Sequence, residues 1–148
     1  MTPIRILLAD DHAVVRDGLR ALIEKQTDMA VVAEAADGRE AAQLAEEYLP
    51  DVVVMDIGMP DLNGIEACRQ ILESLPDTQV VMLSMHSDEG YVLRALKAGA
   101  RAYLLKDSAE ADLARAIRAA AGGKSFFSCQ PKCLQYSSRP KCAIIYSW

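Results

Sequence analysis

Four apolar segments of this chain each run directly into polar side chains that are suited to phosphoryl chemistry. The segments cover residues 4–9, 52–55, 80–83 and 102–105. The polar residues that follow them are, in chain order, Asp10 and Asp11, Asp56, Ser84, and Lys106. Short apolar segments that alternate with helical patterns indicate strands of a parallel sheet covered on both faces. Because the carboxyl ends of such strands form the ligand crevice, we expect these side chains to meet at one edge of the sheet.

The three carboxylates at this edge favour a divalent cation. Two carboxylate charges 4 Å apart repel each other by about 1–4 kcal/mol, depending on the effective dielectric. A fold tolerates Asp10, Asp11 and Asp56 at adjacent strand ends when a cation lies among them. With oxygen ligands alone, Mg²⁺ is the natural choice, because it binds through one or two carboxylates together with water and phosphate.

The hydroxyl and the amine have lengths that match their expected distances from Asp56. Neighbouring strands lie about 4.8 Å apart. If the strand over 79–84 neighbours the strand that ends at Asp56, the short Ser84 side chain reaches across one strand, and the long Lys106 side chain reaches across two. A Lys ammonium suits a phosphoryl oxygen. A metal, a carboxylate nucleophile, a hydroxyl and an amine are the groups that phosphoryl transfer needs.

Five strand–helix units can be placed along residues 1–123. The predicted strands cover residues 4–9, 30–35, 51–56, 79–84 and 101–105. Apolar residues at helical spacing predict a helix after each strand, the first over 13–25. Pro50 and Pro76 end the second and third helices, and Gly122-Gly123 ends the fifth helix and the domain. Crossovers of this length form right-handed βαβ units, so an α/β fold with a doubly wound parallel sheet follows.

Composition and charge describe a cytoplasmic protein with an acidic body. The chain has 148 residues, 51% of them apolar, which suffices for one core of single-domain size. Residues 1–123 carry all 21 acidic residues, whereas residues 124–148 carry four bases and no acid. The acidic body argues against direct nucleic-acid binding, which normally needs a basic face. We identify neither an apolar stretch of membrane-spanning length nor a signal peptide.

Four motifs together resemble the receiver domain of two-component response regulators. They are Ala9-Asp10-Asp11-His12, Val54-Met55-Asp56-Ile57-Gly58-Met59-Pro60, Leu83-Ser84 and Tyr103-Leu104-Leu105-Lys106-Asp107. Residues 8–16 and 99–108 are similar to the NarL/FixJ (LuxR-type) subfamily in particular. The resemblance covers about residues 3–125. It implies a flavodoxin-like (βα)5 fold with strand order 2-1-3-4-5, as in a chemotaxis receiver domain.

The resemblance also implies a role for each site residue. Asp56 would accept a phosphoryl group from the phosphohistidine of a sensor histidine kinase. Asp11, Asp56 and the backbone carbonyl of Gly58 would bind Mg²⁺ directly. Asp10 would act on the cation largely through water, and Lys106 would hold a phosphoryl oxygen. Such a domain catalyses only its own phosphorylation and dephosphorylation, so the chain is expected to be a signalling domain and not an enzyme.

A conformational switch and a second receiver as partner follow from the same resemblance. Ser84 would move to hydrogen-bond the phosphorylated Asp56, and Tyr103 would swing inward behind it. That local change in charge would rearrange the face made by the fourth helix, fifth strand and fifth helix. We therefore expect a homodimer, formed through this face or through the first and fifth helices.

Several residues depart from the family pattern or allow simpler interpretations. Asp107 stands where many receivers have proline, and a cis bond to a non-proline residue costs about 2.5–4 kcal/mol, so no cis bond is expected there. Gly58 and His86 occupy positions that tune dephosphorylation in the family.

Several of these residues also allow a simpler structural interpretation. Capping of the first helix by Asp11 is compatible with cation binding. His12 and His86 are disfavoured as metal ligands. Ser84 as a satisfied hydroxyl and Tyr103 as plain packing remain open, and Cys68, on an apolar helix stripe, is expected in the core.

The basic tail over 124–148 differs most from the family. NarL-type proteins continue through a linker into a DNA-binding helix-turn-helix, and residues 122–128 still resemble them. From Cys129 onward there is no helical period, and scattered cysteines replace the expected pattern. We interpret the tail as truncated or non-native sequence, so DNA contact would need a module that this chain lacks. A metal site at Cys129, Cys133 and Cys142 lacks a fourth ligand, and a reducing compartment disfavours disulfides.

Two other classes of function can be weighed against a phosphorylated receiver. Phosphohydrolases of the haloacid-dehalogenase type also use an Asp nucleophile and Mg²⁺ on a doubly wound sheet. Their nucleophile follows the first strand in an Asp-x-Asp pattern, whereas this chain has Asp10-Asp11-His12 there. An unphosphorylated interaction scaffold would require an incomplete site. A dinucleotide-binding domain is disfavoured, because the first strand–helix turn has no glycine-rich fingerprint.

Overall fold

Strands and helices alternate along the whole described part of the chain. The structure is a computed structural model that describes residues 2–59, 62–85, 89–106 and 109–127. The strands are β1 (Ile4–Ala9), β2 (Met29–Ala35), β3 (Val52–Asp56), β4 (Gln79–Ser84), β5 (Ala102–Leu105) and β6 (Phe126–Phe127). The helices are α1 (Ala13–Glu24), α2 (Gly38–Tyr48), α3 (Gly64–Ser74), α4 (Glu89–Ala98) and α5 (Ala109–Ala121).

The strands form one parallel sheet in the order β2-β1-β3-β4-β5-β6. This arrangement confirms the five predicted strands, their order 2-1-3-4-5 and the flavodoxin-like fold. The sixth strand was not predicted. Ala102 and Tyr103 of β5 pair with Phe126 and Phe127, so the sheet continues past the predicted domain end at residue 123. Two residues are too few to show the period of a strand in the sequence.

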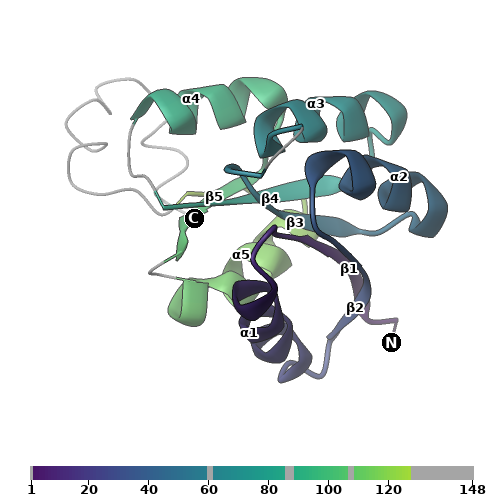
Figure 1. The fold of residues 1–148 in the computed structure, drawn as a ribbon. Helices are drawn as coiled ribbons and strands as arrows, with labels where there is room; N and C mark the ends of the chain where they lie inside the picture. Colours follow the sequence, from purple (N-terminus) through teal and green to yellow (C-terminus); the bar gives the residue numbers. More distant parts are fainter. Residues whose placement is uncertain (1, 60–61, 86–88, 107–108, 128–148) are drawn as a thin grey trace.

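Helices cover both faces of the sheet (Figure 1), with α1 and α5 on one face and α2, α3 and α4 on the other. Alternation along the strands divides the core in two. In β3, Val52 and Val54 pack in the layer that includes Leu19 of α1 and Leu113 of α5. Their neighbours Val53 and Met55 pack with α2 and α3. Because both faces are covered, the strands contain almost no polar residues, which is why they were recognisable as continuous apolar runs.

Helices α2 and α3 begin with side-chain caps, whereas α1 does not. The Asp37 carboxylate accepts a hydrogen bond from the Glu40 amide at 2.7 Å and starts α2. The Asn63 side chain accepts one from the Glu66 amide at 3.0 Å and starts α3. Such caps satisfy amide groups that have no partner within the helix. They fix where each helix begins relative to the strand before it.

One further prediction from the sequence, the burial of Cys68, can be compared with the structure. Cys68 is fully buried in α3, as predicted, and burial raises the pKa of its thiol to about 12. The expectation of a trans bond between Lys106 and Asp107 lies outside the described residues, as does His86. No described helix is both long and apolar enough to cross a membrane.

Candidate functional site

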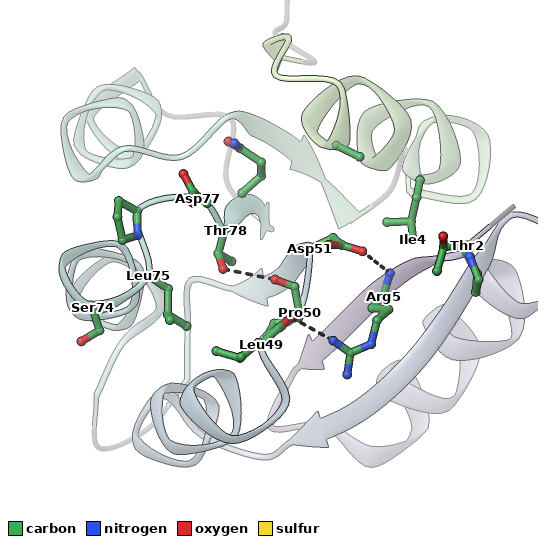
Figure 2. Close-up of a pocket in the computed structure, with 14 residues that line it drawn as sticks. Thr2, Ile4, Arg5, Leu49, Pro50, Asp51, Ser74, Leu75, Asp77 and Thr78 are labelled. Carbon is green, nitrogen blue, oxygen red and sulfur yellow. Dashed lines mark hydrogen bonds between the residues drawn. The ribbon is translucent and has the colours of Figure 1, made fainter.

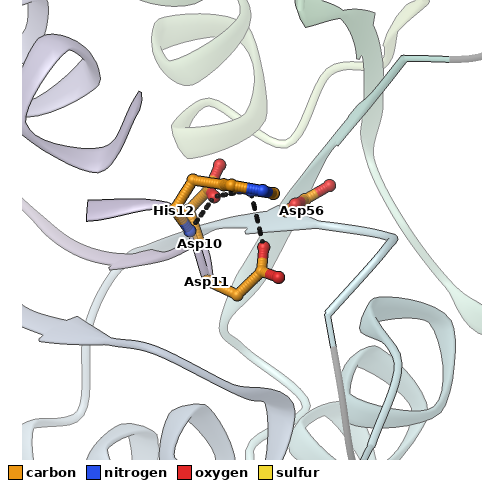
Figure 3. A group of neighbouring side chains, drawn as sticks. All are labelled: Asp10, Asp11, His12 and Asp56. Atoms are coloured by element: carbon orange, nitrogen blue, oxygen red, sulfur yellow. Dashed lines mark hydrogen bonds and ion pairs between the residues drawn. The ribbon is translucent and has the colours of Figure 1, made fainter. Parts of the chain in front are cut away.

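Acidic side chains gather where β1 and β3 end (Figure 3). The group consists of Asp10, Asp11, His12 and Asp56, and one potential ligand atom from each lies within 4.8 Å of the others. Ala9 pairs with Met55 across β1 and β3, so the next residue of each strand carries its carboxylate to the same edge. The structure therefore brings together all three predicted carboxylates.

Lys106 reaches this group from the end of β5. Its Nζ lies 3.0 Å from Asp56 Oδ2 and 3.2 Å from Asp10 Oδ2, and the side chain is only 13% exposed. Burial by itself lowers the pKa of Lys106. Its hydrogen bond to Asp56 and the charges of Asp56 and Asp10 outweigh burial, so the pKa lies above the ordinary value for lysine. The amine therefore carries its proton at neutral pH and bridges the two strand ends as a cation.

The carboxylates of Asp10 and Asp56 are held by neighbouring backbone amides. Asp10 is fully buried, and its Oδ1 accepts a hydrogen bond from the His12 amide at 2.9 Å. Its own amide donates to the Ala35 carbonyl of β2 at 3.0 Å. Asp56 Oδ1 accepts a hydrogen bond from the Gly58 amide at 3.2 Å. Gly58 thus lies beside the Asp56 carboxylate through its amide, and the role of its carbonyl as an Mg²⁺ ligand remains a prediction.

The chemistry of this group fits a divalent cation. Asp10 Oδ2 and Asp11 Oδ1 are buried oxygens with no hydrogen-bond partner among the described residues, although Lys106 and His12 approach them as ion pairs. The group holds three carboxylates and one lysine ammonium, so its acidic groups outnumber the lysine. A hard cation with oxygen ligands, such as Mg²⁺, satisfies both the unpartnered oxygens and the charge.

His12 is part of the group but is mostly exposed. His12, and not Asp11, is the N-cap residue of α1. The His12 side chain makes no capping hydrogen bond. Its Nδ1 lies 3.0 Å from Asp11 Oδ1, and its side chain is 67% exposed. His12 was disfavoured as a metal ligand on the basis of the sequence, and this stays a prediction. The preference of Mg²⁺ for oxygen is consistent with the imidazole lying outside the coordination shell.

Ser84 lies at the end of β4, between the strands that lead to Asp56 and to Lys106, and Tyr103 lies on β5, the strand that leads to Lys106. Leu83 pairs with Asp56, so Ser84 lies one residue further along the neighbouring strand, and it is 2% exposed. Tyr103 is fully buried in β5 and packs in the core shared with α3 and α4. Both residues are therefore close in register to the acidic edge, and their switching roles remain predictions.

Two residues that support the site were not predicted from the sequence. A Cβ on Gly64 would clash with the Asp56 carbonyl oxygen, so only glycine lets α3 start this close to β3. The Asn63-Gly64 pair at a helix start is a signal that could have indicated it. Arg16 donates from Nη1 to the Asp10 carbonyl oxygen at 2.6 Å. Nothing in the spacing of Arg16 distinguishes it from other charged residues on an exposed helix.

A cavity lies at the opposite edge of the sheet (Figure 2). It has a volume of about 720 Å³ and is lined by the amino-terminal ends of β1, β3 and β4. The Arg5 guanidinium donates to the Leu49 carbonyl at 3.0 Å, and the Thr78 hydroxyl donates to the Pro50 carbonyl at 3.1 Å. These contacts tie together loops far from the acidic group. None of the predicted site residues lines this cavity, so its size does not mark the reactive site.

Comparison with known proteins identifies the family. Residues 6–118 match the response regulator receiver domain. The transcriptional regulatory proteins YxjL and LiaR of Bacillus subtilis are 48% and 47% identical over 124 and 121 residues, or 84% and 82% of this chain. The match covers 57% of each, so this chain spans little more than half the length of these relatives.

A solved structure agrees with the fold and with the subfamily. A LuxR-family two-component response regulator from Aurantimonas sp. superimposes with a TM-score of 0.85 at 39% identity, covering 94% of this chain and 99% of that one. The acidic edge, the parallel sheet and these similarities lead to one assignment. The chain belongs to the response regulator receiver domain family, and its relatives are NarL/LuxR-type response regulators.

Proposed function

We propose that this domain accepts a phosphoryl group on Asp56 from the phosphohistidine of a sensor histidine kinase. The observation that carries the proposal is the position of the Asp56 carboxylate. One of its oxygens lies 3.0 Å from the Lys106 ammonium, and the carboxylates of Asp10 and Asp11 lie in the same group. A nucleophile placed between a cation-binding acid pair and a fixed positive charge suits phosphoryl transfer, which depends on positioning and charge neutralisation.

The proposed transfer forms one bond and breaks another. A carboxylate oxygen of Asp56 attacks phosphorus, the new oxygen–phosphorus bond forms, and the phosphorus–nitrogen bond to the kinase imidazole breaks with its electron pair on nitrogen. Lys106 is placed to neutralise a phosphoryl oxygen during the transfer. Asp10, Asp11, Asp56 and the carbonyl of Gly58 would hold Mg²⁺, which when bound neutralises charge on the transferring group.

The output of the domain would be a change in its surface and not a released product. Ser84 and Tyr103 are proposed to respond to the phosphorylated Asp56 and to alter the face made by α4, β5 and α5. That change would favour a homodimer of receivers. The signalling partners are thus a histidine kinase and a second receiver, and the exchange would take place in the cytoplasm.

Regulation of transcription is proposed for the whole protein to which this receiver corresponds. YxjL and LiaR are named transcriptional regulatory proteins, and this chain matches just over half the length of each. The receiver has an acidic body, with 21 acidic residues before residue 124, so we assign DNA contact to a separate module. Membership of the receiver family disfavours the haloacid-dehalogenase alternative, and the labelling experiment below distinguishes a phosphorylated receiver from an unphosphorylated scaffold.

A labelling experiment tests the phosphoacceptor. The protein is incubated with acetyl phosphate and Mg²⁺, and the mass of one added phosphoryl group is followed by intact mass spectrometry. We expect Asp56→Asn to abolish the adduct, because the amide is not nucleophilic. Asp77→Asn, an exposed residue at the opposite edge of the sheet, should label like the parent. Persistent labelling of Asp56→Asn would refute the assignment, and repeated turnover of small phosphate esters would favour a phosphohydrolase.

A further inference from the structure

Arg16 of α1 joins the acidic turn to strand β2. Its Nη1 donates to the carbonyl oxygen of Asp10 at 2.6 Å, and its Nε lies 3.3 Å from Glu34 Oε1 as an ion pair. The Arg16 side chain is 20% exposed and that of Glu34 is 25% exposed, so water screens this pair only partly. The bond from Nη1 to the Asp10 carbonyl is directional, whereas the contact of Nε with Glu34 is an ion pair, because this buried nitrogen makes no hydrogen bond among the described residues.

The hydrogen bond from Arg16 reaches the turn that carries Asp10 and Asp11, the two proposed cation ligands that follow β1. Asp10 and Asp11 lie in the short turn between β1 and α1, and Asp10 also bonds through its amide to Ala35 of β2. The Asp10 carbonyl belongs to the peptide group that joins Asp10 to Asp11. Holding it from the helix side fixes the orientation of the peptide from which the Asp11 side chain extends. Glu34 pairs in register with Leu8, so the anchor belongs to the rigid sheet.

Arg20 provides an internal comparison. It lies one turn further along α1, and it forms ion pairs with the same Glu34 and with Glu24. No contact between Arg20 and Asp10 is found among the described residues. The two arginines therefore share a helix, a charge and a carboxylate partner, and they differ in the bond to the acidic turn.

We infer that Arg16 is a positioning residue for the cation site, which it orients by linking the Asp10 carbonyl to Glu34. The inference rests on the proposed function, because it concerns the same site, and it assigns a role to a residue that does not touch the cation or the phosphoryl group. Partners that orient metal ligands from outside the coordination shell typically change metal affinity by 10- to 100-fold when they are replaced.

Calorimetric titration of the full chain with Mg²⁺ tests the inference without requiring phosphorylation. Arg16→Met keeps most of the aliphatic stem and removes the fork, and we expect it to weaken Mg²⁺ binding about tenfold. Arg20→Met removes the second ion pair to Glu34 and should bind Mg²⁺ like the parent. Arg16→Lys keeps the charge but cannot span both acceptors, so its affinity should fall between those of the parent and Arg16→Met.

Labelling with acetyl phosphate over a range of Mg²⁺ concentrations supplies a second readout. In Arg16→Met, the Mg²⁺ concentration for half-maximal rate should rise, and the rate at saturating Mg²⁺ should recover toward the parent value. Thermal unfolding without Mg²⁺ separates this effect from a general loss of stability, which Arg16→Met and Arg20→Met would share.

The outcomes separate this inference from the proposed function. Unchanged Mg²⁺ affinity in Arg16→Met, an equal loss in Arg20→Met, or full recovery in Arg16→Lys would overturn the role of Arg16. A parent protein that binds no Mg²⁺ would overturn the cation site itself, and with it the inference. A parent that binds Mg²⁺ but takes no label on Asp56 would overturn the proposed function alone.

Discussion

Among single residues, the decisive feature of the site is that one lysine faces three carboxylates. Lys106 contacts Asp56 and Asp10, yet Asp11 remains without a hydrogen bond to its buried oxygen among the described residues. Burying a carboxylate away from water costs several kcal/mol unless it is paired. A divalent cation bound to these carboxylates would relieve this cost, and that relief would contribute to its binding energy.

Removal of one carboxylate tests this balance. Mg²⁺ that binds only the folded state adds about 2.7 kcal/mol to the free energy of unfolding at a concentration one hundred times its dissociation constant. We expect Mg²⁺ to raise the thermal unfolding midpoint of the parent and to have little effect on Asp11→Asn. Asp17→Asn removes an exposed carboxylate from the outer surface of α1 and should respond to Mg²⁺ like the parent. Equal midpoint shifts in all three proteins would contradict a role for Asp11 in cation binding.

At the scale of elements, the site depends on how closely helices approach the strand ends. Gly64 is the first residue of α3, and its own amide donates to the Ile57 carbonyl at 3.0 Å. There is no room for a side chain between this helix start and the backbone of Asp56. The position of Asp56, the proposed phosphoacceptor, therefore depends partly on the absence of a Cβ at the first residue of α3.

Two glycine-to-alanine variants test that close approach. A methyl group at Gly64 would meet backbone atoms of Asp56 and Ile57, so Gly64→Ala should destabilise the protein by about 1–3 kcal/mol and slow labelling. At Gly18, within α1, a Cβ meets nothing within 4 Å. Gly18→Ala should therefore stabilise the protein by about 0.5–1 kcal/mol, because alanine favours the helix. Urea unfolding measures the free energy of unfolding of both variants. An unchanged free energy in Gly64→Ala would show that α3 can move away from β3 without cost.

At the scale of the whole molecule, β6 changes where the sheet ends. Without it, β5 would be an edge strand with unpaired backbone groups next to the proposed output face. Phe126 is half-buried against the α1–α5 layer, and the Arg115 guanidinium lies 5.3 Å from its ring centroid. The segment after α5 is therefore attached to the same strand that carries Tyr103.

Two truncations test whether β6 belongs to the folded unit. A chain that ends after residue 127 keeps the pairing of β6 with β5, whereas one that ends after residue 123 loses both the pairing and the contact of Phe126 with Arg115. We expect the shorter chain to be less stable by at least about 1 kcal/mol in chemical unfolding. Phe126→Ala in the longer chain separates the contribution of the ring from that of the backbone. Equal stabilities would place the domain end at residue 123, as first predicted.

Much of the fold was available from local patterns. Each of the five longer strands was recognisable because both faces of the sheet are covered, and Pro50 and Pro76 marked the ends of α2 and α3. The reactive residue types at the strand ends followed from the same patterns. The order of the strands came from resemblance, because the apolar pattern of a strand does not say which strand lies beside it.

The amino-acid sequence by itself determined which carboxylates and which amine can meet, since every parallel strand delivers its last residue to one edge of the sheet. Tertiary structure alone decided how they are held. The bond from Arg16 to the Asp10 carbonyl, the room left by Gly64 behind Asp56 and the pairing of Phe126 with Ala102 all join residues through space. Such contacts leave no periodic trace along the chain, because each depends on the packing of elements that are separate in sequence.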